Sequence, residues 1–268
     1  MSEIKNRKIL ITGATGGLGE EMVKAFLNEG GELILSDLNQ ASLDSFVQKY
    51  RSFGSGKILG TFSADLSTEE GCDLLVKEYS KYGESPDILV NNAGIAILGP
   101  FSSVPRNKWE KILNINLLAP MRITHSFLPS MLSRKSGHIV NVSSVAGLVA
   151  TPSLNAYCVS KFGIKAFGES LAQEVASSGL KVTNFYPFFT RTPILKSEQI
   201  GVGKELSVPD FLLSEPDDVI RDLMRGIRND SMHVHPGSIA KTVEFVSRFM
   251  PGLLSTFSGA LTNSKSDR

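Results

Sequence analysis

The fold is decided by the stretch Thr12-Gly13-Ala14-Thr15-Gly16-Gly17-Leu18-Gly19, which follows the apolar run Lys8-Ile9-Leu10-Ile11 and precedes a helical pattern over residues 20–28. Strand, glycine turn and helix in this order suit a pyrophosphate, because glycines let the backbone approach it and the helix N-terminus offers free N–H groups. The glycines fit T-G-x-x-x-G-x-G rather than G-x-G-x-x-G. We therefore predict a dinucleotide site that includes Gly13, Thr15, Gly17, Leu18 and Gly19.

Short apolar runs alternate with longer amphipathic stretches along the rest of the chain. We expect strands at residues 8–11, 32–36, 57–63, 87–90, 138–142 and 180–185, and helices at 20–28, 43–50, around 74–79 and 156–175. This alternation predicts right-handed crossovers and a parallel sheet covered on both faces. The 268 residues favour one α/β domain over residues 1–255, with a substrate loop rich in Pro, Gly and Ser at 188–216 and a flexible tail at 256–268.

Composition excludes several classes of protein. Because 28 basic side chains face 27 acidic ones, the formal net charge is +1, and the overall charge predicts no general electrostatic attraction to nucleic acid or to an anionic membrane. No apolar run approaches the ~20 residues that cross a bilayer, and the first residues lack the apolar region of a secretory signal. Two cysteines, Cys72 and Cys158, are too few for a disulfide scaffold and suit reduced thiols. We expect a cytoplasmic protein.

Asp37 decides the choice of cofactor. It lies about 20 residues beyond the glycine turn, where a carboxylate can accept hydrogen bonds from both adenosine ribose hydroxyls. A 2′-phosphate there would be repelled, and Gly16, Leu38 and Asn39 supply no cation to hold it. NAD is therefore favoured over NADP. The alternative is that Asp37 only caps the following helix.

Tyr157 and Lys161 are four residues apart at the start of a long helical pattern, so both can point into one cleft. A free phenol has a pKa near ~10, and a nearby ammonium lowers that value. Tyr157 could then exchange a proton with an alcohol or carbonyl oxygen. Ser143-Ser144 follows the strand at 138–142, where a seryl hydroxyl can hold that oxygen; ordinary turn chemistry also explains paired serines.

Residues 7–195 closely resemble the short-chain dehydrogenase/reductase family, because several motifs occur together in the family's order. They are the glycine turn, Asp65 in Ala64-Asp65-Leu66, Asn91-Asn92-Ala93-Gly94, Asn116 seven residues after Trp109, and Ser144 thirteen residues before Tyr157. The resemblance implies a doubly wound Rossmann-type sheet of seven parallel strands in the order 3-2-1-4-5-6-7. It implies a catalytic tetrad of Asn116, Ser144, Tyr157 and Lys161, and a homodimer or homotetramer. The cofactor residues it adds are Asp65, Leu66, Asn92, Ala93, Gly94, Tyr157, Lys161, Pro187 and Thr192.

One segment departs from the family pattern. Pro187 and Thr192 match, but Phe188 replaces the usual glycine, and the seventh strand is altered to Met232-His233-Val234-His235-Pro236-Gly237. We expect Phe188, Phe189, Val149 and Leu154 to surround a pocket for a hydrophobic alcohol or ketone, such as a steroid-like, acyl-chain or aromatic compound. The predicted reaction is hydride transfer between NAD(H) and that substrate. The alternatives are an NADPH-dependent carbonyl reductase and an NAD(H)-binding sensor or scaffold with little catalysis.

Two other features carry secondary hypotheses. His233 and His235 could share a face, but no third ligand is evident, so no metal site is predicted. A C-terminal helix over residues 238–249 carries an apolar stripe beside Lys241 and Arg248, and Pro251-Gly252-Leu253-Leu254 follows it. Packing on the core or on another subunit explains the stripe, and peripheral contact with a membrane surface is the alternative.

Overall fold

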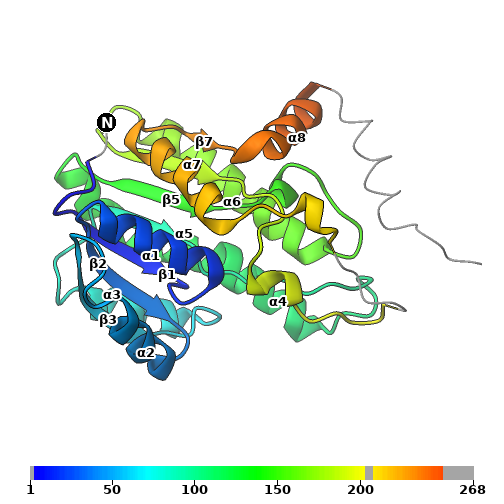
Figure 1. Cartoon of the computed structure of the whole chain (residues 1–268), viewed down its shortest axis with the longest axis horizontal. Coiled ribbons are helices and arrows are strands. Elements are labelled where there is room, and N and C mark those ends of the chain that lie inside the picture. The colour runs from blue at the N-terminus through cyan, green and yellow to red at the C-terminus, as the bar shows by residue number, and fades with distance from the viewer. Residues whose placement is uncertain (1–2, 203–207, 250–268) are drawn as a thin grey trace, which may run out of the picture.

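The computed structural model describes residues 3–202 and 208–249, which form a single α/β domain. One parallel sheet runs through it in the order β3-β2-β1-β4-β5-β6-β7, which confirms the order implied by the resemblance (Figure 1). Its strands are β1 (Lys8–Thr12), β2 (Glu32–Asp37), β3 (Lys57–Ser63), β4 (Ile88–Asn91), β5 (His138–Val142), β6 (Lys181–Phe185) and β7 (His233–Val234). Each predicted strand is therefore present, with ends shifted by one residue or less.

Eight α-helices are found among the described residues. They are α1 (Gly17–Asn28), α2 (Gln40–Tyr50), α3 (Glu69–Tyr79), α4 (Arg106–Leu113), α5 (Ala119–Ser133), α6 (Asn155–Glu174), α7 (Pro216–Arg228) and α8 (Gly237–Phe249). A π-helical segment, Asn114–Leu118, joins α4 to α5. Helices α1, α2 and α3 each begin earlier in the chain than predicted. In α1 the reason is that the last glycines of the motif form the first helical turn. Helices α4, α5 and α7 were not predicted; prolines at positions 120, 129 and 216 obscured the last two.

Side chains alternate between two cores, one on each face of the sheet. Ile9 and Ile11 of β1 join the core beneath α1, α2 and α7, whereas Leu10 between them joins the core beneath α3, α5 and α6. A period of two residues along a strand produces this alternation. Because both faces are covered by helices, a ligand can reach the sheet only at the ends of its strands.

A ladder of buried amides crosses the sheet beneath α6. Asn91, Asn141 and Asn184 are partners in register on β4, β5 and β6, and all three are buried. Asn91 Nδ2 donates to Asn141 Oδ1 at 2.9 Å, and Asn141 Nδ2 donates to Asn184 Oδ1 at 3.4 Å. Asn184 Nδ2 then donates to the carbonyl of Lys165 on α6 at 3.3 Å, which Gly168 permits because a Cβ there would lie 2.1 Å from Asn184 Oδ1. The ladder thus sets how closely α6 lies on the sheet.

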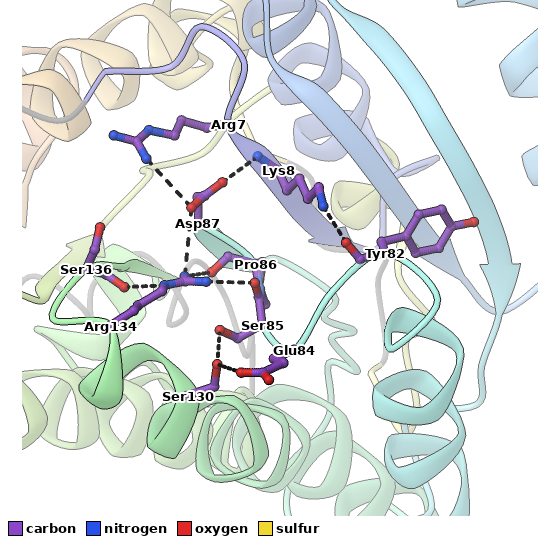
Figure 2. Close-up of polar contacts among 10 residues, drawn as sticks. All are labelled: Arg7, Lys8, Tyr82, Glu84, Ser85, Pro86, Asp87, Ser130, Arg134 and Ser136. Carbon is purple, nitrogen blue, oxygen red and sulfur yellow. Dashed lines mark hydrogen bonds and ion pairs between the residues drawn. The ribbon is translucent and has the colours of Figure 1, made fainter.

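A polar network closes the sheet at the amino ends of β1 and β4 (Figure 2). Asp87 accepts a hydrogen bond from the backbone N–H of Lys8 at 2.9 Å and lies 3.7 Å from Arg7 and 4.0 Å from Arg134. Arg134 also donates to the carbonyls of Ser85 and Ser136, at 3.0 and 2.7 Å. This network ties the end of α5 to the strands. It lies at the edge opposite the predicted site.

The segment 188–216, predicted as a substrate loop, contains short helical turns and backbone hydrogen bonds to its neighbours. It contains two 3-10 turns, Pro193–Lys196 and Asp210–Leu212, and residues 203–207 within it lie outside the described residues. The backbone N–H of Ser214 donates to the carbonyl of Phe189 at 2.8 Å, and that of Ile200 donates to the carbonyl of Leu98 at 2.8 Å. The predicted tail at 256–268 also lies outside the described residues. Across residues 3–202 and 208–249, no helix is long and apolar enough to cross a bilayer.

Burial of His138 predicts an acid-sensitive fold. His138 is 2% exposed on β5, and burial lowers its pKa to about 4. The unfolded chain therefore binds a proton first as pH falls from about 6.5 towards 4, so stability present at neutral pH is lost over that range. The shift corresponds to about 3 kcal/mol of unfolding free energy. In urea titrations at pH 7 and pH 4.5, His138→Gln should lose clearly less stability on acidification than the wild type.

His125→Gln is the matched control, because His125 is exposed on α5. Its loss between the two pH values should equal that of the wild type. An identical loss for His138→Gln and the wild type would contradict the assignment to His138.

Candidate active site

The glycine turn between β1 and α1 packs directly on the segment that follows β4. Gly13 has φ of +64°, and a Cβ there would lie 2.8 Å from Ala93 Cα. Asn92 Nδ2 donates to the carbonyls of Thr12 and Gly13 at 3.0 and 2.9 Å, and Thr12 Oγ1 accepts from the backbone N–H of Asn92 and Ala93, each at 3.1 Å. The turn is thus held in shape by protein contacts alone.

Gly17 and Gly19 lie where the turn packs so closely that a side chain would clash with Thr192 or with the turn's own backbone. A Cβ on Gly19 would lie 2.2 Å from the carbonyl oxygen of Gly13, and one on Gly17 would lie 2.7 Å from the side chain of Thr192. The side chain of Leu18 packs against the core, so only its backbone faces the turn. Because α1 begins at Gly17, the first N–H groups of the helix lack intrahelical partners. The bare backbone and these free donors fit a dinucleotide pyrophosphate.

Asp37 faces the glycine turn and does not cap α2. Its Oδ2 accepts from the backbone N–H and the hydroxyl of Thr15, at 2.9 and 2.7 Å, and its Oδ1 accepts from the N–H of Leu38 at 2.7 Å. Asn39 is the cap of α2, since its side chain accepts from the N–H of Ser42. The capping alternative for Asp37 is therefore wrong, and the carboxylate stands beside the turn.

The other residues expected at the adenine end follow β3. Asp65 is exposed, and its Oδ1 accepts from the backbone and hydroxyl of Ser67 at 2.9 and 2.7 Å. These hydrogen bonds lower the pKa of the Asp65 carboxyl. Leu66 is buried in the core beneath α3, which leaves its backbone as the part able to contact a ligand.

Tyr157 and Lys161 lie on the first turns of α6, as their spacing predicts. Lys161 is 4% exposed, and its Nζ donates to the carbonyl of Val142, at the end of β5, at 2.8 Å. Nζ is 5.6 Å from the centroid of the Tyr157 ring. Burial lowers the pKa of Lys161 to about 8. Burial also raises the pKa of Tyr157 to about 12, opposed by a hydrogen bond from Ser144 that acts to lower it.

Ser144 and Asn116 lie close to this pair. Ser144 is the residue after Ser143 at the carboxyl end of β5, and its Oγ accepts from the N–H of Ala146 at 3.1 Å. Asn116 is 2% exposed within the π-helical segment; its side chain exchanges two 2.9 Å hydrogen bonds with the backbone of Ile95. A Cβ on Gly94 would lie 3.4 Å from Asn116 Oδ1 and 3.6 Å from Lys161 Nζ. The structure therefore brings the four predicted residues to one edge of the sheet.

Ser143 and Ser160, which lie outside the predicted tetrad, hold this arrangement together. Ser143 Oγ donates to the carbonyl of Lys161 at 2.8 Å, which fixes α6 against β5. Ser160 is buried; it donates to the carbonyl of Tyr157 at 2.7 Å and accepts from Asn116 Nδ2 at 3.1 Å. The only sequence signal for either was its position beside a predicted residue.

Phe188 is accommodated without backbone strain. Among the described residues, the non-glycine positions with positive φ are Asn6, Lys135, Ser153 and Asp230, so Phe188 keeps an ordinary conformation. Its ring meets that of Phe189 edge-on, with centroids 4.7 Å apart. Pro187 is buried before it, and its carbonyl accepts from the N–H of Val145 at 3.1 Å. Both aromatic rings and the expected pocket residues Val149 and Leu154 are partly exposed.

The histidine pair packs against a tyrosine. Tyr186 OH lies 3.0 Å from His233 Nδ1, and the His235 ring stacks on Tyr186 at 4.6 Å. Among the described residues no group of three or more His, Cys, Asp or Glu side chains could hold a metal ion. Cys72 and Cys158 are both buried free thiols, and burial raises the pKa of each.

Solved structures share this fold. A short-chain dehydrogenase from Sphingobium yanoikuyae in complex with NADPH superposes with a TM-score of 0.78 at 22% identity, covering 98% of each chain. A short chain dehydrogenase/reductase from Burkholderia phymatum in complex with NAD gives a TM-score of 0.79 at 23% identity, covering 94% of this chain and 97% of that one.

Sequence comparison identifies the family as well as the fold. Estradiol 17-beta-dehydrogenase 11 from Homo sapiens is 34% identical over 236 residues, which cover 87% of this chain and 75% of that protein. Dehydrogenase/reductase SDR family member 7B from Danio rerio is 32% identical over 232 residues, covering 84% and 75%. The family model described as short chain dehydrogenase matches residues 7–201. The chain therefore belongs to the short-chain dehydrogenase/reductase family.

Proposed function

We propose that this protein transfers hydride between NAD(H) and a hydrophobic secondary alcohol or carbonyl compound. The observation that carries the proposal is the segment Asn92-Ala93-Gly94, which touches both halves of the site. Asn92 and Ala93 contact the glycine turn, and Gly94 lies beside Asn116 and Lys161. A dinucleotide on the turn would therefore extend towards Tyr157, Lys161 and Ser144.

The proton chemistry follows from the environments of Tyr157 and Lys161. With a pKa of about 12, the Tyr157 phenol is protonated at neutral pH and can donate its proton to a carbonyl oxygen. In the oxidising direction, the phenolate takes the alcohol proton, and an ammonium at Lys161 would stabilise that phenolate. Ser144 holds the reacting oxygen, and Asn116 keeps a relay water in place. A bound nicotinamide supplies or accepts the hydride.

The NAD preference rests on Asp37. Thr15 and Leu38 hold its carboxylate at the rim of the glycine turn, where ribose hydroxyls would meet an acceptor and a 2′-phosphate would meet a like charge. Around it we assign the cofactor contacts to Gly13, Thr15, Gly17, Leu18, Gly19, Asp65, Leu66, Asn92, Ala93, Gly94, Tyr157, Lys161, Pro187 and Thr192. The second candidate is an NADPH-dependent carbonyl reductase.

The substrate class rests on the aromatic pair at the site. Phe188 and Phe189 offer an apolar wall directly after Pro187, whose carbonyl lies 3.5 Å from Ser144 Oγ. A hydrophobic alcohol or ketone fits such a wall. The name of the Homo sapiens relative, estradiol 17-beta-dehydrogenase 11, makes a steroid-like alcohol the first compound to assay.

We further propose a cytoplasmic homodimer or homotetramer. Helix α6 exposes Val159 and Phe162 on the side away from the sheet, and a second copy of the chain could cover them.

Replacing Tyr157 tests the proton donor. Tyr157→Phe should lower kcat by about 10²- to 10⁴-fold, since it removes the only transferable proton of that ring. The affinity for NADH, followed by cofactor fluorescence, should stay within about twofold of the wild type. Tyr82→Phe, at the opposite edge of the sheet (Figure 2), is the matched control and should keep full activity. Undiminished turnover in Tyr157→Phe would remove Tyr157 from the mechanism.

Replacing Asp37 tests the cofactor. Wild-type protein should bind NADH at least ~tenfold more tightly than NADPH, and Asp37→Ala should shrink that ratio by relieving repulsion of the 2′-phosphate. Asp44→Ala on α2 carries the same charge change away from the turn and should leave the ratio unaltered. Tighter binding of NADPH by the wild type would favour the carbonyl reductase, and binding of NADH without turnover of any alcohol would favour a sensor.

Replacing Ser160 tests how Asn116 is held. Ser160→Ala leaves Asn116 Nδ2 with one acceptor fewer, so kcat should fall about fivefold to fiftyfold while the Kd for NADH changes little. Ser160→Thr should restore part of the rate, because it keeps a hydroxyl. Ser170→Ala, on an exposed turn of the same helix, serves as the control. A fall in NADH affinity equal to the fall in kcat would indicate a general disturbance of α6.

A further inference from the structure

Helix α8 presents aromatic side chains to the outside. Phe245 is 57% exposed and Phe249 is 64% exposed; they are four positions apart in the helix, and their ring centroids are 4.9 Å apart. Figure 1 shows α8 standing out from the body of the domain beyond α7. Single exposed apolar residues are common, but a contiguous aromatic pair on a projecting helix needs a reason.

Only a narrow stripe of α8 is attached to the rest of the protein. Ala240 is its single fully buried side chain, and the helix contacts α7 and the turn Val145–Gly147. The backbone N–H of Gly237 donates to Asp222 Oδ2 on α7 at 3.1 Å, which anchors the start of the helix. Phe245 and Phe249 therefore point away from a fixed support.

Two of the three charged side chains of α8 are cations. Lys241 and Arg248 are exposed and flank the aromatic pair, and the Arg248 guanidinium lies 5.9 Å from the Phe249 ring centroid. Glu244 is the single carboxylate of α8; it is only half-exposed, and its Oε1 is 3.9 Å from Arg248. With two cations and one carboxylate, α8 has a net charge of +1, so a second copy docked on this face would meet a helix of the same charge. An anionic surface complements the face better.

The sequence beyond the helix has the same character. Met250-Pro251-Gly252-Leu253-Leu254 follows directly in the sequence and is mostly apolar. A helix with aromatic residues on one face, cations on its border and an apolar continuation has the composition of a segment that lies in a membrane interface.

We propose that α8 docks on the surface of an anionic lipid bilayer, with Phe245 and Phe249 entering the headgroup boundary and Lys241 and Arg248 contacting acidic headgroups. Because α8 also contacts Val145–Gly147, directly after Ser144, docking places the bilayer near the candidate active site. The docking itself does not depend on the proposed reaction.

Co-sedimentation with vesicles tests the proposal on the full chain. Wild-type protein should bind phosphatidylcholine vesicles that contain phosphatidylserine, and bind pure phosphatidylcholine vesicles weakly. The double variant Phe245→Ser/Phe249→Ser should lose at least ~tenfold in partition coefficient, because two half-exposed rings no longer leave water. Lys241→Gln and Arg248→Gln should each cost about fivefold on the acidic vesicles and flatten the salt dependence.

Two controls distinguish docking on lipid from self-association and from a general effect of losing an apolar side chain. Leu74→Ser replaces an exposed apolar residue on α3 and should bind like the wild type. Light scattering without lipid should give the same mass for wild type and double variant. NADH binding, measured in parallel, reports on the proposed function separately.

Three outcomes would count against lipid docking. Wild type that ignores acidic vesicles, or a double variant that binds as tightly as the wild type, would overturn the proposal. A drop in mass for the double variant with no lipid binding by the wild type would assign this face to a second copy.

Discussion

The contact between the start of α6 and the carboxyl end of β5 is the interaction on which the rest of the site depends. Lys161 is buried and donates to the carbonyl of Val142, while Ser143 donates back to the carbonyl of Lys161. Gly147 lets the two segments meet, since a Cβ there would lie 2.5 Å from the Lys161 carbonyl oxygen. An ammonium removed from water is costly unless it is hydrogen-bonded, and this cost lowers the pKa of Lys161. The same packing fixes where Tyr157 points.

A second constraint joins this contact to the glycine turn. The segment after β4 lies between them, and it approaches the turn this closely because Gly13 carries no side chain. Asn92 closes the turn, and Asn116 closes the loop at Ile95, so both ends of the segment are fixed by amide hydrogen bonds. Dinucleotide and proton chemistry are thus positioned by one short stretch of backbone.

Two features at the surface, Phe188 and helix α8, are not fixed by the packing that holds the site together. The position where the family usually has glycine holds Phe188, whose backbone conformation is ordinary, so the substitution changes the wall of the site and leaves its support intact. Helix α8 lies beyond residue 201, where the match to the family model ends. The outward face of α8 therefore lies outside the part that matches the family, and it carries the exposed aromatic pair Phe245 and Phe249.

Local patterns in the sequence predicted the strands, the glycine turn and the placement of Tyr157 beside Lys161 on one helix. The strand order, Asn116 and the choice of Ser144 came from the resemblance to the family. The sequence left the role of Asp37 open between ribose contact and helix cap, and the folded chain excludes the second because Asn39 caps α2. It also gave no role to Ser160 or to the amide ladder. Those depend on which strands and helices become neighbours, and partners 44 residues apart leave no periodic signal in the chain.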